Sequence, residues 1–346
     1  MKRREKKSYR VGIQSIDQTI QGLVQQVAES RNSDLINDLF TTIVKIAREK
    51  ASRGDLKVLN TAVKELRHTF RVFEPYRHVR KVAIFGSART PASAATYKSA
   101  RQFGKLMAAA GWMVITGGST GIMRAGHEGA GGFRSFGLNI RLPFEQEVNP
   151  VIRDNQKLIH YKYFFTRKLA FIKESHATVL YPGGFGTHDE GVESLTLVQT
   201  GKDIPRPIVL VDTQHGRYWE AWLEYVSRYL LRNKMISPDD LSLPTLVKSP
   251  EEAREVVLKF YGVYHSLRYV GQETVIRTNR EISSQKLKQL NKDFRHLLIN
   301  GRIELSGALP AEADESEIQD LPRLKMRFNR RTYGSLKRFI DALNQT

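Results

Sequence analysis

Residues 177–181 read Ala-Thr-Val-Leu-Tyr, residues 182–190 read Pro-Gly-Gly-Phe-Gly-Thr-His-Asp-Glu, and residues 191–200 read Gly-Val-Glu-Ser-Leu-Thr-Leu-Val-Gln-Thr. The first segment is apolar or β-branched, as in a buried parallel strand. Pro182 ends that strand, and the glycines after it allow a sharp turn. Thr187 is a favourable helix N-cap, and the apolar residues beyond it recur at helical spacing. A strand, a glycine-rich turn and a helix N-terminus in this order predict a phosphate-binding site.

Glu190 has two interpretations. Thr187 and Glu190 stand at capping-box spacing, so the carboxylate can reach back to the backbone N–H of Thr187. Alternatively, Glu190 lies beside a bound phosphate ester, where repulsion by the phosphate favours a sugar hydroxyl or a water as its partner. The two roles are compatible, and the local pattern does not choose between them.

Composition excludes several classes of protein. The chain has 346 residues, enough for a large core and more than one folding unit. It has no cysteine, which excludes disulfides, thiolate zinc sites and a cysteine nucleophile. No apolar run is long enough to span a membrane, and no apolar segment follows the basic tail at 1–10, so we expect a cytoplasmic protein that does not contact a membrane.

The charge balance points to an anionic ligand. The chain carries 55 Lys and Arg against 36 Asp and Glu, a net charge of +19, and such an excess attracts polyanions. The basic residues are spread along the chain, and no recognised nucleic-acid motif is present. A solvated basic surface that also attracts phosphorylated small molecules is therefore favoured over a dedicated nucleic-acid binder.

Three regions differ in their periodicity. Residues 1–78 follow a helical pattern after the basic tail, with breaks near 32–34 and 52–55, and we expect this region to serve in packing or dimerisation. Residues 79–264 alternate strands with helices, which predicts an α/β fold with an open parallel sheet. Its strands are expected at 82–85, 112–115, 137–140, 158–159, 177–181 and 208–211. Residues 265–346 predict a small α+β unit in the order β-α-β-β-α, with elements at 274–277, 283–298, 302–305, 324–328 and 335–343.

Three glycine-rich turns follow strands of the predicted sheet, so they should meet at one edge, where such sheets bind their ligands. They contain Gly86 and Ser87, then Gly117, Gly118, Ser119 and Gly121, and finally Gly183, Gly184, Gly186 and Thr187. Arg167 lies in the first turn of a predicted helix at the same edge, where a cation is slightly unfavourable but is tolerated if a site needs the charge. The alternative is a surface arginine or one paired with Glu174 or Asp189.

Several motifs together resemble the LOG (Lonely Guy) family, many of whose members were once labelled "possible lysine decarboxylase". They are Pro-Gly-Gly-Phe-Gly-Thr-x-x-Glu at 182–190, Arg-Lys at 167–168 and Gly-Gly-Ser-x-Gly-Ile-Met at 117–123. Further segments are similar to those of the longer bacterial branch, namely Phe-Gly-Ser-Ala-Arg at 85–89 and the residues at 137–143 and 199–202. The resemblance covers roughly residues 80–260.

The resemblance implies a Rossmann-like fold with helices on both faces of the sheet, a homodimer or higher homo-oligomer, and an AMP-like nucleoside 5′-monophosphate as substrate. The implied reaction is hydrolysis of the N-glycosidic bond to free base and ribose 5-phosphate, without a metal or a cofactor. Arg167 and Glu190 are the implied catalytic pair, and Gly183, Gly184, Gly186 and Thr187 would hold the phosphate. The implied nucleotide-binding residues are Gly86, Ser87, Gly117, Gly118, Ser119, Gly121, Lys168 and Asp189.

Three positions depart from the family's pattern. Arg124 stands where long members commonly carry Glu, although Glu128 lies one turn further on. His188 replaces the usual apolar residue, and Gly191 lies in the expected first helical turn, where Gly costs roughly 1 kcal/mol relative to Ala. These departures keep two alternatives open. One is a non-catalytic protein that binds or senses a nucleotide or a phosphorylated cofactor, and the other is a nucleic-acid-binding relative of the same fold.

Overall fold

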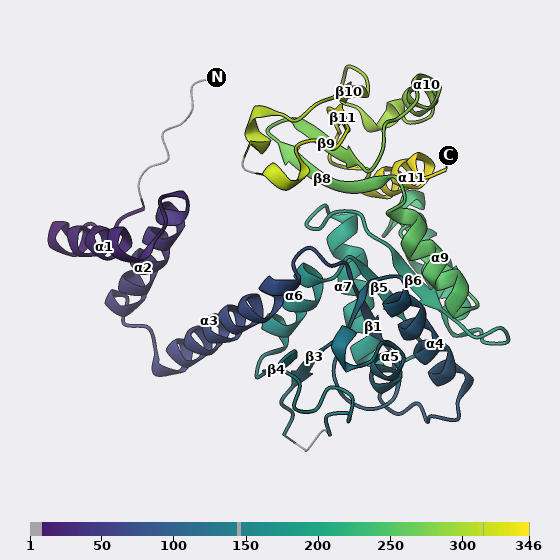
Figure 1. Cartoon of the computed structure of the whole chain (residues 1–346), viewed down its shortest axis with the longest axis horizontal. Coiled ribbons are helices and arrows are strands. Elements are labelled where there is room, and N and C mark those ends of the chain that lie inside the picture. The colour runs from purple at the N-terminus through teal and green to yellow at the C-terminus, as the bar shows by residue number, and fades with distance from the viewer. Residues whose placement is uncertain (1–8, 144–146, 314, 346) are drawn as a thin grey trace. The chain divides into compact units, whose positions relative to one another are not determined.

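The computed structural model describes residues 9–143, 147–313 and 315–345, which belong to two compact units, Met1–Glu65 and Leu66–Thr346 (Figure 1). Residues 1–8 of the predicted basic tail lie outside the described residues. The first unit contains helices α1 (Gln14–Val27) and α2 (Ser33–Arg48), whose apolar faces meet around Ile20 and Val24. Helix α3 (Arg53–Phe73) begins in the first unit and ends in the second. The predicted helical N-terminal region is thereby confirmed.

The second unit contains the predicted parallel sheet, which has seven strands. They are β1 (Lys81–Phe85), β2 (Met113–Thr116), β3 (Ser135–Ile140), β4 (Leu158–Tyr161), β5 (Ala177–Leu180), β6 (Ile208–Val211) and β7 (Pro244–Val247). Their spatial order is β4-β3-β2-β1-β5-β6-β7, and every neighbouring pair is parallel. The chain winds in one direction from β1 to β4 and in the other from β5 to β7. The switch point of the sheet therefore lies between β1 and β5.

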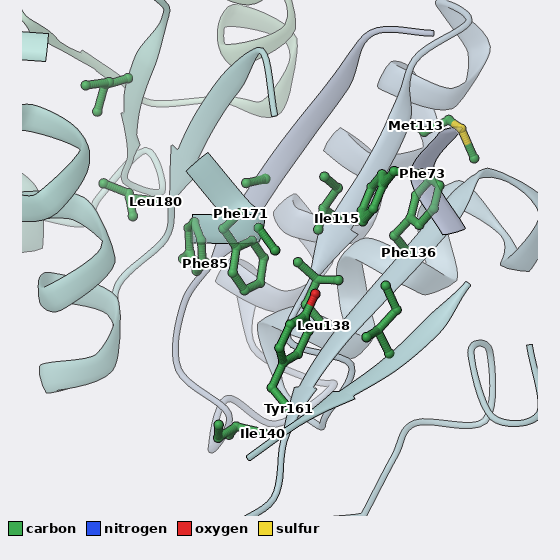
Figure 2. Close-up of a cluster of buried hydrophobic side chains, with 14 of the residues drawn as sticks. Phe73, Phe85, Met113, Ile115, Phe136, Leu138, Ile140, Tyr161, Phe171 and Leu180 are labelled. Carbon is green, nitrogen blue, oxygen red and sulfur yellow. The ribbon is translucent and has the colours of Figure 1, made fainter. Parts of the chain in front are cut away.

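Helices cover both faces of this sheet. One face carries α4 (Ala95–Ala109), α5 (Ile122–Ala130) and α9 (Pro250–Phe260), packed through residues such as Phe103 and Val257. The other carries α6 (Phe164–Glu174), α7 (Phe185–Gln199) and α8 (Tyr218–Tyr225). Figure 2 shows the core on this second face, where Phe85 and Leu180 of the central strands lie near Phe171 of α6. Burial on both faces explains why these strands read as short apolar runs.

The C-terminal part of the second unit forms a separate antiparallel sheet with its own core. Its elements are β8 (Tyr264–Val270), β9 (Glu273–Thr278), α10 (Ser284–Asp293), β10 (Glu304–Ser306), β11 (Arg323–Met326) and α11 (Tyr333–Leu343). The strand order is β10-β11-β9-β8, and α11 contributes Leu336, Phe339 and Ile340 to the core. The predicted α+β character is confirmed, but the predicted element order is wrong, because β8 precedes β9.

Two strands, β7 and β8, were not predicted from the sequence, and each has a physical reason. Strand β8 has an irregularity between Tyr264 and Ser266, which breaks the period-two alternation that identifies a strand. Strand β7 is an edge strand that begins with Pro244 and is mostly half-buried, so it lacks a continuous apolar signal. The predicted helix at 283–298 is also too long, since α10 ends at Asp293.

Candidate functional site

A cavity of about 640 Å³ lies at the carboxyl ends of β1, β2 and β3, beside the turn that follows β5. Its wall contains the polar side chains of Ser87, Arg89, Arg167, Thr187 and Glu190 and the small residues Gly86, Ala88, Gly117, Gly184 and Gly186. Its apolar wall consists of Phe85, Met123, Ile140, Leu142, Phe164, Phe171 and Phe185. The strand order explains this position, because β1 and β5 are neighbours and their glycine-rich turns meet at the switch point.

Helix α7 begins earlier than the sequence pattern predicted. Its N-cap is Gly184 and its first residue is Phe185, so Thr187 lies inside the first turn. The N–H of Thr187 donates to the carbonyl of Gly184 at 3.0 Å. The interpretation of Thr187 and Glu190 as a capping box is therefore wrong, since that N–H is already used. The first two residues of the helix, Phe185 and Gly186, have N–H groups with no acceptor inside it, and both residues line the cavity.

Arg167 and Glu190 form a buried ion pair in the cavity wall. Arg167 Nη2 lies 3.4 Å from Glu190 Oε1, and the two side chains are 14% and 3% exposed. Helix α6 supplies the arginine and α7 the glutamate, so the pair joins two helices. Within the described part of the chain, Glu190 Oε2 and Arg167 Nε have no hydrogen-bond partner. A buried carboxylate oxygen that faces no protein donor is available to a ligand or a water.

Burial shifts the pKa of both members of this pair toward the neutral form. Burial raises the pKa of Glu190 above its ordinary value of 4.5, and the charge of Arg167 acts against this shift. Burial lowers the pKa of Arg167, and Glu190 opposes that change. The guanidinium nevertheless stays charged, because its ordinary pKa is far above neutrality. The cavity wall thus offers a cation and a carboxylate in low-dielectric surroundings, where their effect on a charged ligand is strong.

Lys168 and Asp189 lie beside this pair but outside the cavity wall. Lys168 Nζ contacts Asp189 Oδ1 at 2.9 Å and Glu193 Oε2 at 2.7 Å. These contacts join α6 to α7 a second time. Lys168 and Asp189 thus connect the two helices that carry Arg167 and Glu190.

The loop at 117–121 reaches the cavity only through Gly117. The neighbouring Gly118, Ser119 and Gly121 do not line the cavity. The N–H of Asn149 donates to the carbonyl of Gly118 at 2.9 Å, and Asn149 Nδ2 donates to that of Ser119 at 3.0 Å. The same amide lies 3.1 Å from Nδ1 of His127, whose pKa burial lowers to about 4. His127 is therefore a neutral support of this loop.

The departures from the family's pattern have local explanations. Arg124 Nε pairs with Glu128 Oε1 at 2.7 Å, and the Tyr97 hydroxyl donates to the other oxygen of Glu128. Neither Arg124 nor Glu128 lines the cavity, so the arginine does not reverse the charge of its wall. A Cβ at Gly191 would lie 2.8 Å from Leu180 Cδ1, so α7 packs closely on β5 at this position and a larger residue would require the Leu180 side chain to shift.

Sequence reasoning missed one cation and most of the apolar wall. Arg89 lines the cavity directly after Ser87, and its position in the Phe-Gly-Ser-Ala-Arg segment was the available signal. Met123, Ile140, Leu142 and Phe164 carry no comparable signal, because apolar residues beside strands and helices usually belong to the core.

Two structural features are absent from the described residues. No helix among them combines the length and the apolar character that crossing a bilayer requires. No group of three His, Cys, Asp or Glu side chains among them is placed to hold a metal ion.

The sheet and the turns at its carboxyl edge define the class of fold to which this protein belongs. A doubly wound parallel sheet with glycine-rich turns and a helix N-terminus at its switch point is a Rossmann-like fold of the nucleotide-binding type. Residues 119–257 match the family model described as "Possible lysine decarboxylase". This match confirms, for residues 119–257, the LOG-family resemblance predicted from the motifs.

Three solved structures are similar to about half of this chain. The molybdenum cofactor binding protein from Rippkaea orientalis is 21% identical over 52% of this chain and 94% of that chain, with a TM-score of 0.37. The molybdenum cofactor carrier protein from Chlamydomonas reinhardtii is 22% identical over 52% and 97%, with a TM-score of 0.37. DNA processing protein A from Helicobacter pylori is 16% identical over 52% and 80%, with a TM-score of 0.37. No curated protein matches the chain.

Proposed function

We propose that this protein hydrolyses the N-glycosidic bond of nucleoside 5′-monophosphates and releases the free base and ribose 5-phosphate. The observation that carries the proposal is the Arg167–Glu190 pair, which lies in the wall of the same cavity as the turn at 184–187. Burying a carboxylate costs free energy of folding. A protein that only holds an anion gains nothing from a buried carboxylate at that point, whereas a glycosidase requires one.

The cavity suits each part of such a substrate. The N–H groups and the dipole at the start of α7 favour a 5′-phosphate, and Arg89 adds a cation to the wall. The apolar wall, which includes Met123 and Phe171, suits the flat face of a base. Glu190 and Arg167 then stand beside the ribose that connects phosphate and base. The volume of about 640 Å³ lies within the usual range of small-molecule sites.

The proposed chemistry follows from this placement. The bond between C1′ and the base nitrogen breaks, its electron pair leaves with the base, and positive charge develops on C1′ and the ring oxygen. Ionised Glu190 stabilises that charge, and its unpaired Oε2 can accept a proton from the water whose oxygen attacks C1′. That proton then passes from Glu190 to the departed base, which leaves as the neutral free base and restores the carboxylate. Arg167 orients Glu190 and can donate a hydrogen bond to the phosphate or to the leaving base.

The direct test is incubation of the full chain with AMP, GMP, IMP, CMP and UMP, with separate assays of free base and ribose 5-phosphate. We expect equimolar release of both products from at least one monophosphate. The matched nucleosides, which lack the phosphate, should give a kcat/KM at least about tenfold lower, because the phosphate supplies binding energy and orientation. No release by folded protein would contradict the proposal. Monophosphate binding without turnover would then support the non-catalytic alternative, and steeply salt-dependent RNA binding would support the nucleic-acid-binding one.

We also propose that the protein is a homodimer or a higher homo-oligomer that uses an apolar face on α6 and α7. The exposed apolar residues of this face are Phe164, Phe165, Leu169, Phe185 and Val192. The ion pairs of Arg167 and Lys168 with α7 hold the two helices side by side. Exposed apolar patches of this kind mark association sites, and a second copy of the chain would cover the same face on both subunits.

Leu169→Glu is expected to shift the protein toward the monomer, because a second copy would then bury an unpaired carboxylate. Sedimentation velocity over a range of concentrations measures the effect. Leu305→Glu is the matched control, since Leu305 is similarly exposed but lies in the C-terminal sheet. Wild-type protein that sediments as a monomer, or two variants that sediment like an oligomeric wild type, would contradict the proposed face.

A further inference from the structure

Tyr218 contacts the glycine-rich turn from a different strand–helix unit. It is the first residue of α8, and its hydroxyl donates a hydrogen bond to the carbonyl oxygen of Gly183 at 2.5 Å. Nε2 of His188, near the start of α7, lies 2.6 Å from the same hydroxyl oxygen. The single hydroxyl proton of Tyr218 is used toward Gly183, so Nε2 of His188 carries a hydrogen and donates it. A chain of hydrogen bonds therefore runs from His188 through Tyr218 to Gly183.

Both side chains of this hydrogen-bond chain are held in place. Asp212, which follows β6 and is buried, accepts the N–H of Trp219 at 3.1 Å and fixes the start of α8 at the edge of the sheet. The ring of His188 lies 5.4 Å from the ring of Trp219 and 5.8 Å from that of Tyr218. The start of α8, which carries Tyr218, is thus anchored to the sheet by a contact separate from the turn.

The carbonyl of Gly183 and the N–H of Gly184 belong to one peptide unit. In a planar trans peptide these two groups point in opposite directions. Tyr218 and His188 do not line the cavity, whereas Gly184 does. A hydrogen bond that holds the Gly183 carbonyl toward Tyr218 therefore leaves the Gly184 N–H free to face the cavity. The reversed peptide would instead present a carbonyl oxygen, which repels an anion.

The surroundings of Gly183 explain why the turn needs such a hold. A Cβ at this position would lie 2.1 Å from Thr187 Oγ1 and 2.9 Å from the backbone N of Ser87, so only glycine fits between the two segments. Glycine, however, has little intrinsic preference for one backbone conformation. The hydrogen bond from Tyr218 therefore favours one orientation of this peptide.

We propose that Tyr218 and His188 are positioning residues for the anion-binding turn, which hold the Gly183 carbonyl outside the cavity and thereby aim the Gly184 N–H at a bound phosphate. This inference rests on the phosphate site of the proposed function. The inference also gives a role to His188, which stands where the family usually has an apolar residue. Only a side chain with a hydrogen-bond donor can donate to the Tyr218 hydroxyl and so extend the chain of hydrogen bonds.

The test compares Tyr218→Phe with the wild type in two separate assays. Isothermal titration calorimetry with inorganic phosphate should show a Kd raised about three- to tenfold, the usual effect of one neutral hydrogen bond. Steady-state kinetics with the best monophosphate should show KM raised by a similar factor and kcat within about a factor of two. Tyr225→Phe is the matched control, because Tyr225 lies on the same helix outside the cavity wall.

Two variants of His188 separate positioning from packing. His188→Leu should raise the phosphate Kd about two- to threefold, whereas His188→Gln keeps an N–H donor and should restore the wild-type value. An unchanged phosphate Kd in Tyr218→Phe, a loss confined to kcat, or a wild type that does not bind phosphate would overturn the inference. Base release decides the proposed function independently. Weaker phosphate binding in Tyr218→Phe without any base release would support the positioning role and reject the hydrolase.

Discussion

Glu190→Gln is expected to lower the rate of base release by about 10²- to 10⁴-fold, the usual contribution of a positioned acid–base group. The substitution keeps the size of the side chain and an oxygen for Arg167, but it removes the negative charge beside the ribose. KM for the monophosphate should change little, because the turn at 184–187 and Arg89 remain. The measurement is kcat and KM with the best substrate, and circular dichroism verifies that the variant is folded.

Glu193→Gln is the matched control for this prediction. Glu193 lies on α7 one turn beyond Glu190, but it pairs with Lys168 outside the cavity wall. Its rate should stay within about threefold of the wild type, since Lys168 keeps Asp189 as its second partner. If Glu190→Gln retained most of the activity, the carboxylate would not be part of the chemistry.

The pH dependence of kcat/KM gives a second readout of the same carboxylate. The reaction requires ionised Glu190, so activity should fall as the pH decreases. Burial raises the pKa of Glu190, and we therefore expect the midpoint of the acid limb above the ordinary carboxyl value of 4.5. An acid limb at or below 4.5 would show that another group controls the rate.

Glu312→Ala is expected to lower the free energy of unfolding of the C-terminal sheet by roughly 3–5 kcal/mol, the usual cost of removing one partner of a buried ion pair. Glu312 is fully buried, with Arg277 Nε 2.8 Å from Oε1 and Arg323 Nε 3.1 Å from Oε2. Arg277 would keep Glu315, but the other hydrogen bonds of Arg323 go to the carbonyls of Ile318, Gln319 and Leu321. Denaturant unfolding and amide hydrogen exchange of β9 and β11 would measure the loss.

The control for this variant is Glu317→Ala in the same segment. Glu317 is 61% exposed and pairs with Arg77 on the surface, so its removal should cost no more than about 1 kcal/mol. The pH dependence has a defined sign. Burial acts to raise the pKa of Glu312, but the Leu309 N–H and the two arginines outweigh it, so the folded pKa lies below the ordinary 4.5. The stabilisation is therefore present above 4.5 and is lost as the pH falls through the folded value, a loss that Glu312→Ala should lack.

Local patterns were sufficient to predict most of the α/β architecture. Strands such as β5 and β6 are buried on both faces, and the physical consequence is an apolar run that can be read directly. The helices are read from their three- and four-residue spacing, and the glycine-rich turns are read from composition. Because parallel strands end at one edge, the order of elements along the chain also predicts that Ser87, Gly117 and Gly184 share a site, and all three line the cavity.

Local patterns also misled where two local explanations fitted the same residues. The side chain of Thr187 makes it the more favourable N-cap residue in the sequence pattern. In the structure the N-cap is nevertheless Gly184, and the helix begins at Phe185. The irregular strand β8 and the edge strand β7 lack the period that a fully buried or regular strand would show.

The ion pair of Arg167 and Glu190 depends on which strands are neighbours. Its members are 23 residues apart and stand on different helices, and the contact forms only because α6 and α7 pack on the same face of the sheet. The contact between Tyr218 and Gly183 spans 35 residues and requires β6 beside β5. Sequence periodicity reports the environment of each element, whereas such contacts depend on strand order and helix packing. The helices and strands of this protein therefore follow from local sequence, whereas the contacts between residues of its site follow from the tertiary structure.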